Sequence, residues 1–401
     1  MRRRTTLAAV AGLALVGACG AFAVRQRWVE VLLLLAPDRR VENFRRMGEI
    51  FPSRSVPRAG PVFEFARAER PLDVTYPFAG ERRHLDAFLE RTTTTGLLVI
   101  QDDAIVLEQY RLGASDESLL TSFSVAKSVV SALVGFALAD GSIRSLDDPV
   151  TAYVPELAGS GYDGVPIRHV LEMSSGVRFD ENYANPLSDV NLMFAGSFLF
   201  GSSIDAVARG LPSQHRSGEA YEYKSVDTQV LAAVVRAATG RTLSADLSLR
   251  IWGPLGMERD ARWVVDSDRP DAVEYAFCCL NATLRDWARF ARLYLRQGNW
   301  QGAQLLPADW IHASVTPSRP ELMLQGLYSP AWDVGYAYQW WVPAGDEGEF
   351  TAIGVWGQYL YVNPAERLVI VKTSADPGFD DRDLETIAAF RGIVNALRTA
   401  R

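Results

Sequence analysis

Segments with the pattern of β-strands lie near both ends of the chain, and the long stretch between them is mainly helical in pattern. Residues 96–100 and 104–110 are apolar runs on either side of a turn, which predicts a hairpin. Residues 350–355, 359–362 and 368–373 alternate with turn residues, as the strands of an antiparallel meander do. This distribution predicts a mixed α/β (α+β) fold, in which strands from both ends form one antiparallel sheet flanked by helices.

The same pattern divides the 401 residues into four parts. Residues 1–27 are a signal peptide or membrane anchor, and residues 28–80 are an N-terminal arm. Residues 81–150 and 271–401 together form the predicted α/β sheet domain. Residues 151–270 contain few strand-like runs and are predicted to form a helical lobe inserted between the two halves of the sheet.

The first residues have the pattern of an export signal. Arginines at positions 2–4 precede an uncharged stretch from Thr5 to Val24, and residues 21–23 suit a signal peptidase. The residues before Cys19 resemble a bacterial lipobox, which makes Cys19 a candidate for lipidation. The uncharged stretch is also about long enough to span a bilayer uncleaved. We expect an exported protein, periplasmic or membrane-anchored through its N-terminus; the alternative is a cytoplasmic protein with a buried N-terminal helix.

Charge and metal-ligand content exclude several kinds of partner. The net charge of −7 gives no reason to expect nucleic-acid binding. The four histidines are scattered without an H-E-x-x-H pattern, so we expect no metal and no cofactor. Cys278 and Cys279 are neighbours, and a bridge between neighbours strains ordinary disulfide geometry. We therefore expect no disulfide framework.

A serine and a lysine stand at the start of the apolar run 129–139. Ser124 and Lys127 are three residues apart, so a helix places them on one face. The free N–H groups and the dipole at a helix N-terminus favour developing negative charge, and the lysine adds a cation. These features describe an activated serine nucleophile. The alternative is a chance S-x-x-K in which Ser124 only caps the helix.

Two later stretches supply the other groups that such a serine needs, a proton-handling group and a second oxyanion donor. Tyr223 precedes the apolar run 228–235, and a lysine ammonium beside it would lower its pKa, which makes it a candidate base. Trp356, Gly357 and Gln358 lie between two strand-like runs, where a glycine lets a substrate approach the strand edge. The alternatives are an ordinary half-buried tyrosine and a simple turn.

Together these motifs resemble those of serine hydrolases with the β-lactamase and penicillin-binding-protein fold. That family has S-x-x-K first, Y-x-N or Y-x-S second, and K-T-G, H-x-G or W-x-G third. The stretches that follow this order here are Ser124-Val125-Ala126-Lys127, Tyr223-Lys224-Ser225 and Trp356-Gly357-Gln358. The resemblance covers roughly residues 90–397 and implies a β-lactamase/transpeptidase-like fold with an acyl-enzyme on Ser124.

Within this family the chain is similar to the branch that includes the 6-aminohexanoate-dimer hydrolase. Residues 175–183, 223–228 and 336–341 show this similarity. In that branch a tyrosine after the S-S-G-V segment contacts the substrate amide, and Tyr183 is the matching residue. The resemblance also implies a set of residues that bind the substrate or the oxyanion, by side chain or backbone N–H. They are Tyr183, Ser225, Trp356, Gly357, Gln358 and Tyr359.

Departures from the family pattern point away from β-lactams. Trp356 stands where lactam-recognising enzymes place a cation, and Ser225 replaces the asparagine of Y-x-N. No glutamate stands in an S-D-N-type context. Lys372-Thr373-Ser374 looks like K-T-G, but it follows the apolar residues 368–371 and is predicted to end the next strand. The expected substrate is therefore a small ester or linear amide.

Other functions stay open at this point. A penicillin-binding-type sensor, a D-aminopeptidase or DD-peptidase, and a weak β-lactamase with slow turnover share the same motifs. A structural envelope protein is a further alternative. A Ser-His-Asp α/β-hydrolase would need G-x-S-x-G, which the sequence lacks. An apolar wall of the pocket is expected from Phe194, Phe198, Leu199 and Phe200.

Overall fold

An eight-stranded sheet lies at the centre of the computed structural model, which describes Val29, residues 33–319 and residues 334–399. In spatial order its strands are β12 (Val334–Tyr336), β13 (Trp341–Pro343), β14 (Phe350–Gly354), β15 (Gln358–Asn363), β16 (Leu368–Ser374), β5 (Thr94–Gln101), β6 (Ala104–Tyr110) and β2 (Ala66–Arg67). All neighbours pair antiparallel except β2 and β6. Strand β16 pairs with β5 over its whole length, which confirms that strands from both ends of the chain form one sheet.

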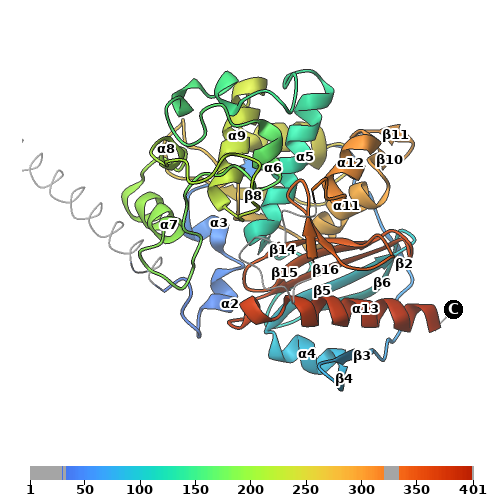
Figure 1. Cartoon of the computed structure of the whole chain (residues 1–401). Coiled ribbons are helices and arrows are strands. Elements are labelled where there is room, and N and C mark those ends of the chain that lie inside the picture. Colours follow the sequence, from blue (N-terminus) through green and yellow to red (C-terminus); the bar gives the residue numbers. More distant parts are fainter. Residues whose placement is uncertain (1–28, 30–32, 320–333, 400–401) are drawn as a thin grey trace, which may run out of the picture.

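Helices cover both faces of this sheet (Figure 1). Helix α13 (Asp383–Thr399) and the short α4 (Leu85–Arg91) lie on one face, where the ring of Phe390 contacts Tyr359 and Tyr361. Helix α11 (Leu284–Leu295) lies on the other face. These three helices agree with the periodicity of their sequences, which places apolar side chains on one side of each helix.

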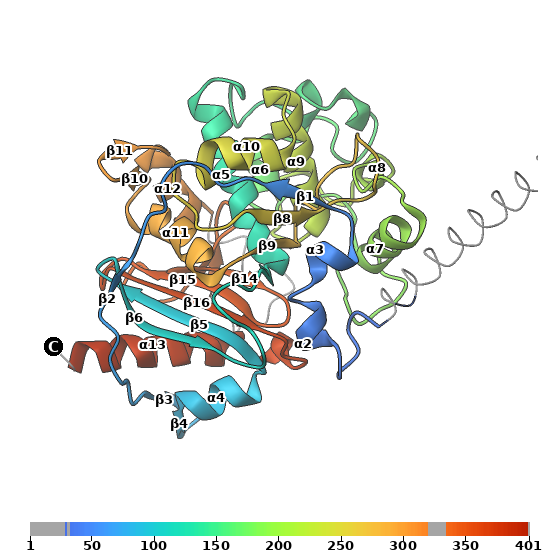
Figure 2. The ribbon, with the colours of Figure 1, turned by 180° about the vertical axis from the view of Figure 1, so that it is seen from behind.

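A group of helices lies beyond α11, on the side away from α13 (Figures 1 and 2). Its members are α5 (Ala126–Ala139), α6 (Ile167–Leu171), α7 (Asp189–Phe200), α8 (Ala206–Arg209), α9 (Ser225–Thr239) and α10 (Leu243–Leu247). Helix α5 is buried from its first residue to Ala137, because it is apolar on all sides and other elements surround it. The domain boundaries near residues 150 and 271 stay a prediction.

A second, smaller sheet was not predicted. Its order is β1 (Ser53–Val56), β8 (Ala261–Val264), β9 (Leu280–Ala282) and β7 (Leu120–Thr121). It joins the N-terminal arm to the helical region and to the residues just before Ser124. The arm also contains α2 (Arg40–Asn43), α3 (Met47–Ile50) and β3 (Thr75–Phe78), which forms a hairpin with β4 (Glu81–His84) just beyond the arm.

The predicted leader or anchor at residues 1–27, with Cys19, lies outside the described residues. Searching the described part of the chain for membrane spans finds no helix with the length and apolarity to cross a bilayer. The cysteines require a correction, because the structure joins Cys278 to Cys279 by a disulfide. Cys279 has a positive φ of 64°, and this turn of the backbone accompanies the bridge between neighbours.

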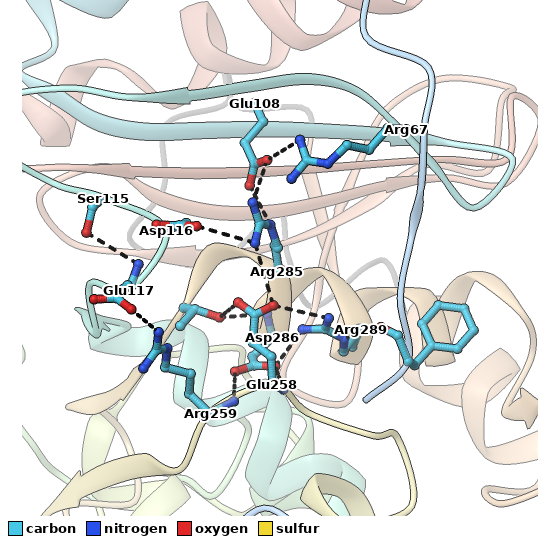
Figure 3. Close-up of polar contacts among 12 residues, drawn as sticks. Arg67, Glu108, Ser115, Asp116, Glu117, Glu258, Arg259, Arg285, Asp286 and Arg289 are labelled. Atoms are coloured by element: carbon cyan, nitrogen blue, oxygen red, sulfur yellow. Dashed lines mark hydrogen bonds and ion pairs between the residues drawn. The ribbon is translucent and has the colours of Figure 1, made fainter. Parts of the chain in front are cut away.

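A network of ion pairs fixes α11 between the two sheets (Figure 3). Arg285 donates from Nε and Nη2 to the carboxylate of Glu108 on β6, at 2.7 and 2.9 Å. One turn further along α11, Arg289 donates to Asp286 at 2.8 Å and to the Phe63 carbonyl at 2.9 Å. These contacts connect the helix to the large sheet, to the arm and to itself.

Candidate active site

Ser124 and Lys127 meet at the start of α5. Ser124 lies in the short 3₁₀ turn η1 (Phe123–Val125), and Lys127 Nζ donates a hydrogen bond to its Oγ at 2.9 Å. Lys127 Nζ also reaches Ser225 Oγ and the Phe277 carbonyl, each at 3.2 Å. Ser225 is the first residue of α9. The structure thus brings the first two predicted motifs together around one lysine nitrogen.

Burial dominates the electrostatics of Lys127, whose side chain is 1% exposed. Desolvation lowers its pKa to about 7, although the nearby carboxylate of Glu181 acts in the opposite direction. Aromatic rings supply part of its surroundings, with the ring centres of Tyr223 and Phe277 at 4.7 and 5.6 Å from Nζ. Burial therefore favours the uncharged form of this lysine, which can accept a proton.

Tyr223 lies beside this lysine and against an aromatic neighbour. Its ring stacks on Trp341 of β13 at 5.7 Å between ring centres. Tyr223 and Trp341 form part of the same wall of a cavity. Lys127 Nζ lies 2.9 Å from Ser124 Oγ, and the proton-handling role of Tyr223 stays a prediction.

The end of β14 approaches the nucleophile turn very closely. A Cβ atom at Gly354 would lie 2.5 Å from the carbonyl oxygen of Ser122 and 3.1 Å from the backbone nitrogen of Ser124. Both neighbours are backbone atoms that cannot rotate away, so glycine is required for this approach. Strand β14 pairs with β13 at one residue pair near its start, and the edge near Gly354 is left facing Ser124.

Ser124 opens into a cavity of about 490 Å³. Its lining residues are Ser124, Phe179, Asp180, Glu181, Asn182, Tyr183, Ala184, Tyr223, Trp341, Ile353, Gly354, Val355, Phe379, Asp380 and Asp383. The predicted residues Ser124, Tyr183 and Tyr223 are thus brought together. The lining contains four carboxylates and, among the residues the structure describes, no arginine or lysine. Nowhere in the described ranges do three or more metal-ligating side chains cluster.

Five residues of the predicted binding set lie outside this lining, namely Ser225, Trp356, Gly357, Gln358 and Tyr359. The hydroxyl of Tyr359 donates to Asp383, and its ring packs on α13, so the side chain lies against the helix rather than in the cavity. The amide of Gln358 is held by the Ser374 carbonyl at 2.8 Å. The sequence prediction selected the turn, whereas the cavity is lined by the strand end just before it.

The expected apolar wall is also misplaced. Phe194, Phe198, Leu199 and Phe200 are absent from the lining. Phe194 and Phe198 pack on each other and on Tyr275, with ring centres 5.5, 6.1 and 4.7 Å apart. Phe194 and Phe198 therefore pack helix α7 against the protein interior.

Sequence reasoning missed Glu181. Its Oε2 accepts a hydrogen bond from the Ser225 backbone N–H at 2.8 Å, and its Oε1 accepts from the Ser225 hydroxyl at 2.5 Å. Oε1 also accepts from the Tyr183 hydroxyl at 2.6 Å. Ser225 therefore connects Lys127 to a carboxylate at the cavity wall. No motif marks this glutamate, since Ser225 lies on a helix 44 residues further along the chain.

Comparisons with known proteins found a matching family and related proteins. The beta-lactamase family model matches residues 82–391. The 6-aminohexanoate-dimer hydrolase of Paenarthrobacter ureafaciens is 32% identical over 346 residues, which cover 84% of this chain and 86% of that protein. Esterase EstB of Burkholderia gladioli is 33% identical over 168 residues, 40% of this chain and 42% of the esterase.

Solved structures show the same fold. A Bacillus anthracis protein described as a candidate 6-aminohexanoate-dimer hydrolase superposes with a TM-score of 0.80 at 24% identity, over 92% of this chain and 96% of that one. An octameric penicillin-binding protein homologue from Pyrococcus abyssi gives a TM-score of 0.60 at 19% identity, over 79% and 77% of the two chains. These likenesses confirm the β-lactamase/transpeptidase-like fold.

Proposed function

The chain belongs to the beta-lactamase family, and we propose that it is a serine hydrolase that cleaves a small ester or linear amide through an acyl-enzyme on Ser124. The proposal rests above all on the 2.9 Å contact between Lys127 Nζ and Ser124 Oγ at the wall of a 490 Å³ cavity. A serine hydroxyl beside a lysine of lowered pKa is an activated nucleophile. A cavity of this size admits a small-molecule substrate.

The proposed reaction has two steps. Uncharged Lys127 accepts the proton of Ser124 as Oγ attacks the substrate carbonyl. The oxyanion is bound by the Ser124 N–H and by the N–H of Val355, which follows Gly354 at the open edge of β14. The leaving group departs with a proton from Lys127 or Tyr223, and water then hydrolyses the acyl-enzyme. This assignment moves the first proton transfer from Tyr223 to Lys127.

The charge of the cavity favours a substrate that carries an amine. Asp180, Glu181, Asp380 and Asp383 line the cavity. Burial raises the pKa of Asp383 to about 7, so part of this group is uncharged at neutral pH, and the other carboxylates would repel an anionic substrate group. The carboxylate of a β-lactam is such a group. The Paenarthrobacter relative is named as a 6-aminohexanoate-dimer hydrolase. Two 6-aminohexanoate units joined by one amide bond carry an amine at one end and a carboxylate at the other. We propose the same broad class, amine-bearing linear amides and esters, for this chain.

A matched substrate panel tests this function. We expect the p-nitroanilide of 6-aminohexanoic acid to be cleaved with a kcat/KM about tenfold or more above that of its N-acetyl derivative, because acetylation removes the cation that the carboxylates attract. A short p-nitrophenyl ester should be turned over, and nitrocefin should be a poorer substrate than either. Release of p-nitroaniline or p-nitrophenol and hydrolysis of nitrocefin are all followed by absorbance, with one enzyme preparation.

Two outcomes of the panel would contradict the proposal. Nitrocefin as the best substrate would assign the protein to β-lactam hydrolysis. A burst of one product per enzyme with no steady state would indicate a penicillin-binding-type sensor, since the acyl-enzyme would form without being hydrolysed.

The pKa of Lys127 predicts the pH dependence of the reaction. Below a pH of about 7 this lysine is protonated and cannot accept the serine proton, so kcat/KM for a p-nitrophenyl ester should rise with pH through about 7 and then level off. Because Glu181 raises the pKa of Lys127, Glu181→Gln should move the midpoint to lower pH. The measurement is kcat/KM from pH 5 to 9 for both enzymes, and a profile without a step in that range would contradict the role of Lys127.

A further inference from the structure

The N-terminal arm places one aromatic side chain between the two backbone segments that approach the oxyanion site. Phe44 follows α2 and is 3% exposed. Its ring meets Phe123 edge-on at 4.9 Å and Trp356 at 5.8 Å between ring centres. Its carbonyl also accepts a hydrogen bond from the Thr121 N–H at 3.2 Å. Figures 1 and 2 both show α2 beside the end of β14.

A second arm residue holds the same tryptophan from another direction. The guanidinium of Arg40 lies 4.6 Å from the centre of the Trp356 ring, and its Nε donates to the Ala375 carbonyl at 3.0 Å. Arg40 is 7% exposed, so this contact is largely shielded from solvent. Trp356 is thus packed between two residues of the arm.

Both aromatic residues that Phe44 touches have unfavourable backbone conformations. Phe123 has a φ of 42° and Trp356 a φ of 65°, and neither is a glycine. Such conformations persist only where surrounding contacts enforce them, and they concentrate at functional sites. Phe123 immediately precedes Ser124, and Trp356 immediately follows Val355. The two strained residues therefore flank the two N–H groups assigned to the oxyanion.

From this arrangement we infer that Phe44 and Arg40 are positioning residues, which hold the N–H groups of Ser124 and Val355 in the geometry that binds the oxyanion. This inference rests on the proposed function. The arm is remote in sequence from both segments and touches them through Phe44, so it sets their distance from each other. Small displacements of such donors lower the reaction rate more than they affect ground-state binding.

Phe51 provides a matched control for the experiment. It lies in the same arm, is 2% exposed and stacks on Phe198 at 4.3 Å, away from the cavity. We expect Phe44→Ala to lower kcat for a p-nitrophenyl ester about tenfold to a hundredfold, with KM changed less than about threefold. Phe51→Ala should leave both constants within about threefold of the wild type after correction for the folded fraction.

One further measurement and two further variants separate positioning from general destabilisation. Phenylboronic acid forms a tetrahedral adduct with an active serine, so its inhibition constant should rise in Phe44→Ala in proportion to the loss of kcat. Phe44→Tyr keeps the ring and should restore most of the rate. Arg40→Met keeps a long apolar side chain and should also lower kcat. It replaces Phe44→Ala as the test if Phe44→Ala does not fold.

The outcomes are distinguishable from failure of the proposed function. If wild-type enzyme neither turns over esters nor forms the boronate adduct, the proposed function itself is wrong. If the wild type is active and Phe44→Ala and Arg40→Met have the kcat and boronate affinity of Phe51→Ala, the positioning role is wrong. A proportional loss of kcat and boronate affinity at normal KM supports it.

Discussion

Replacement of Ser124 by alanine is expected to lower kcat/KM for p-nitrophenyl esters by at least about a thousandfold and to abolish labelling by a fluorophosphonate probe. The alanine has no oxygen to form the acyl-enzyme, and Lys127 Nζ loses the hydroxyl that it contacts at 2.9 Å. Any residual turnover by Ser124→Ala would come from substrate binding and the oxyanion donors alone. The measurements are steady-state kinetics and mass spectrometry of the labelled protein.

Ser131 offers a control on the same helix. It is fully buried on α5 and lies outside the cavity lining, so Ser131→Ala should keep both ester turnover and labelling. Normal labelling of Ser124→Ala would show that another residue is the nucleophile and would reject the proposed mechanism. Circular dichroism of both variants establishes that they are folded.

The strands of the large sheet could be predicted because their local pattern determines them. Residues 96–100 and 368–371 are apolar runs, and the strands that contain them, β5 and β16, are buried along their whole length. Strands β1, β7, β8 and β9 contain two to four residues each, too few to show a period. Their pairing depends on contacts between distant segments, which is why the second sheet could not be foreseen.

The residues of the candidate site also divide into those that local sequence predicts and those that depend on the assembled fold. Ser124 and Lys127 could be paired from sequence because helical spacing alone brings them together. The strand end that faces Ser124 could not, since it depends on where β14 loses its partner β13, a property of the assembled sheet. The small number of lysines was a signal that the sequence did contain. The chain has three, Lys127, Lys224 and Lys372, and all three are buried in the structure.

Arg289→Ala is expected to destabilise the protein by about 3–5 kcal/mol, the largest stability effect that we predict. The side chains of Arg289 and Asp286 are 0% and 1% exposed and pair at 2.8 Å (Figure 3). The substitution leaves the Asp286 carboxylate buried without this cation. Arg269 pairs with Asp271 on the surface, with side chains 52% and 81% exposed, so Arg269→Ala should cost less than about 1 kcal/mol. Urea unfolding of both variants measures the difference.

The pH dependence of this loss identifies its cause. Burial already raises the pKa of Asp286 to about 6, and Arg289 acts to lower it, so Arg289→Ala should raise the pKa further. A carboxyl group whose pKa is higher in the folded state favours folding below its unfolded pKa, and this contribution is lost as pH rises through the folded pKa. The loss in free energy of unfolding of Arg289→Ala relative to wild type should therefore be larger at pH 8 than at pH 5.

Adding Asp286→Asn to Arg289→Ala should recover part of the loss at pH 8, because it removes the buried charge. A deficit that does not change with pH, and no recovery in the double variant, would show that Arg289 acts through packing alone.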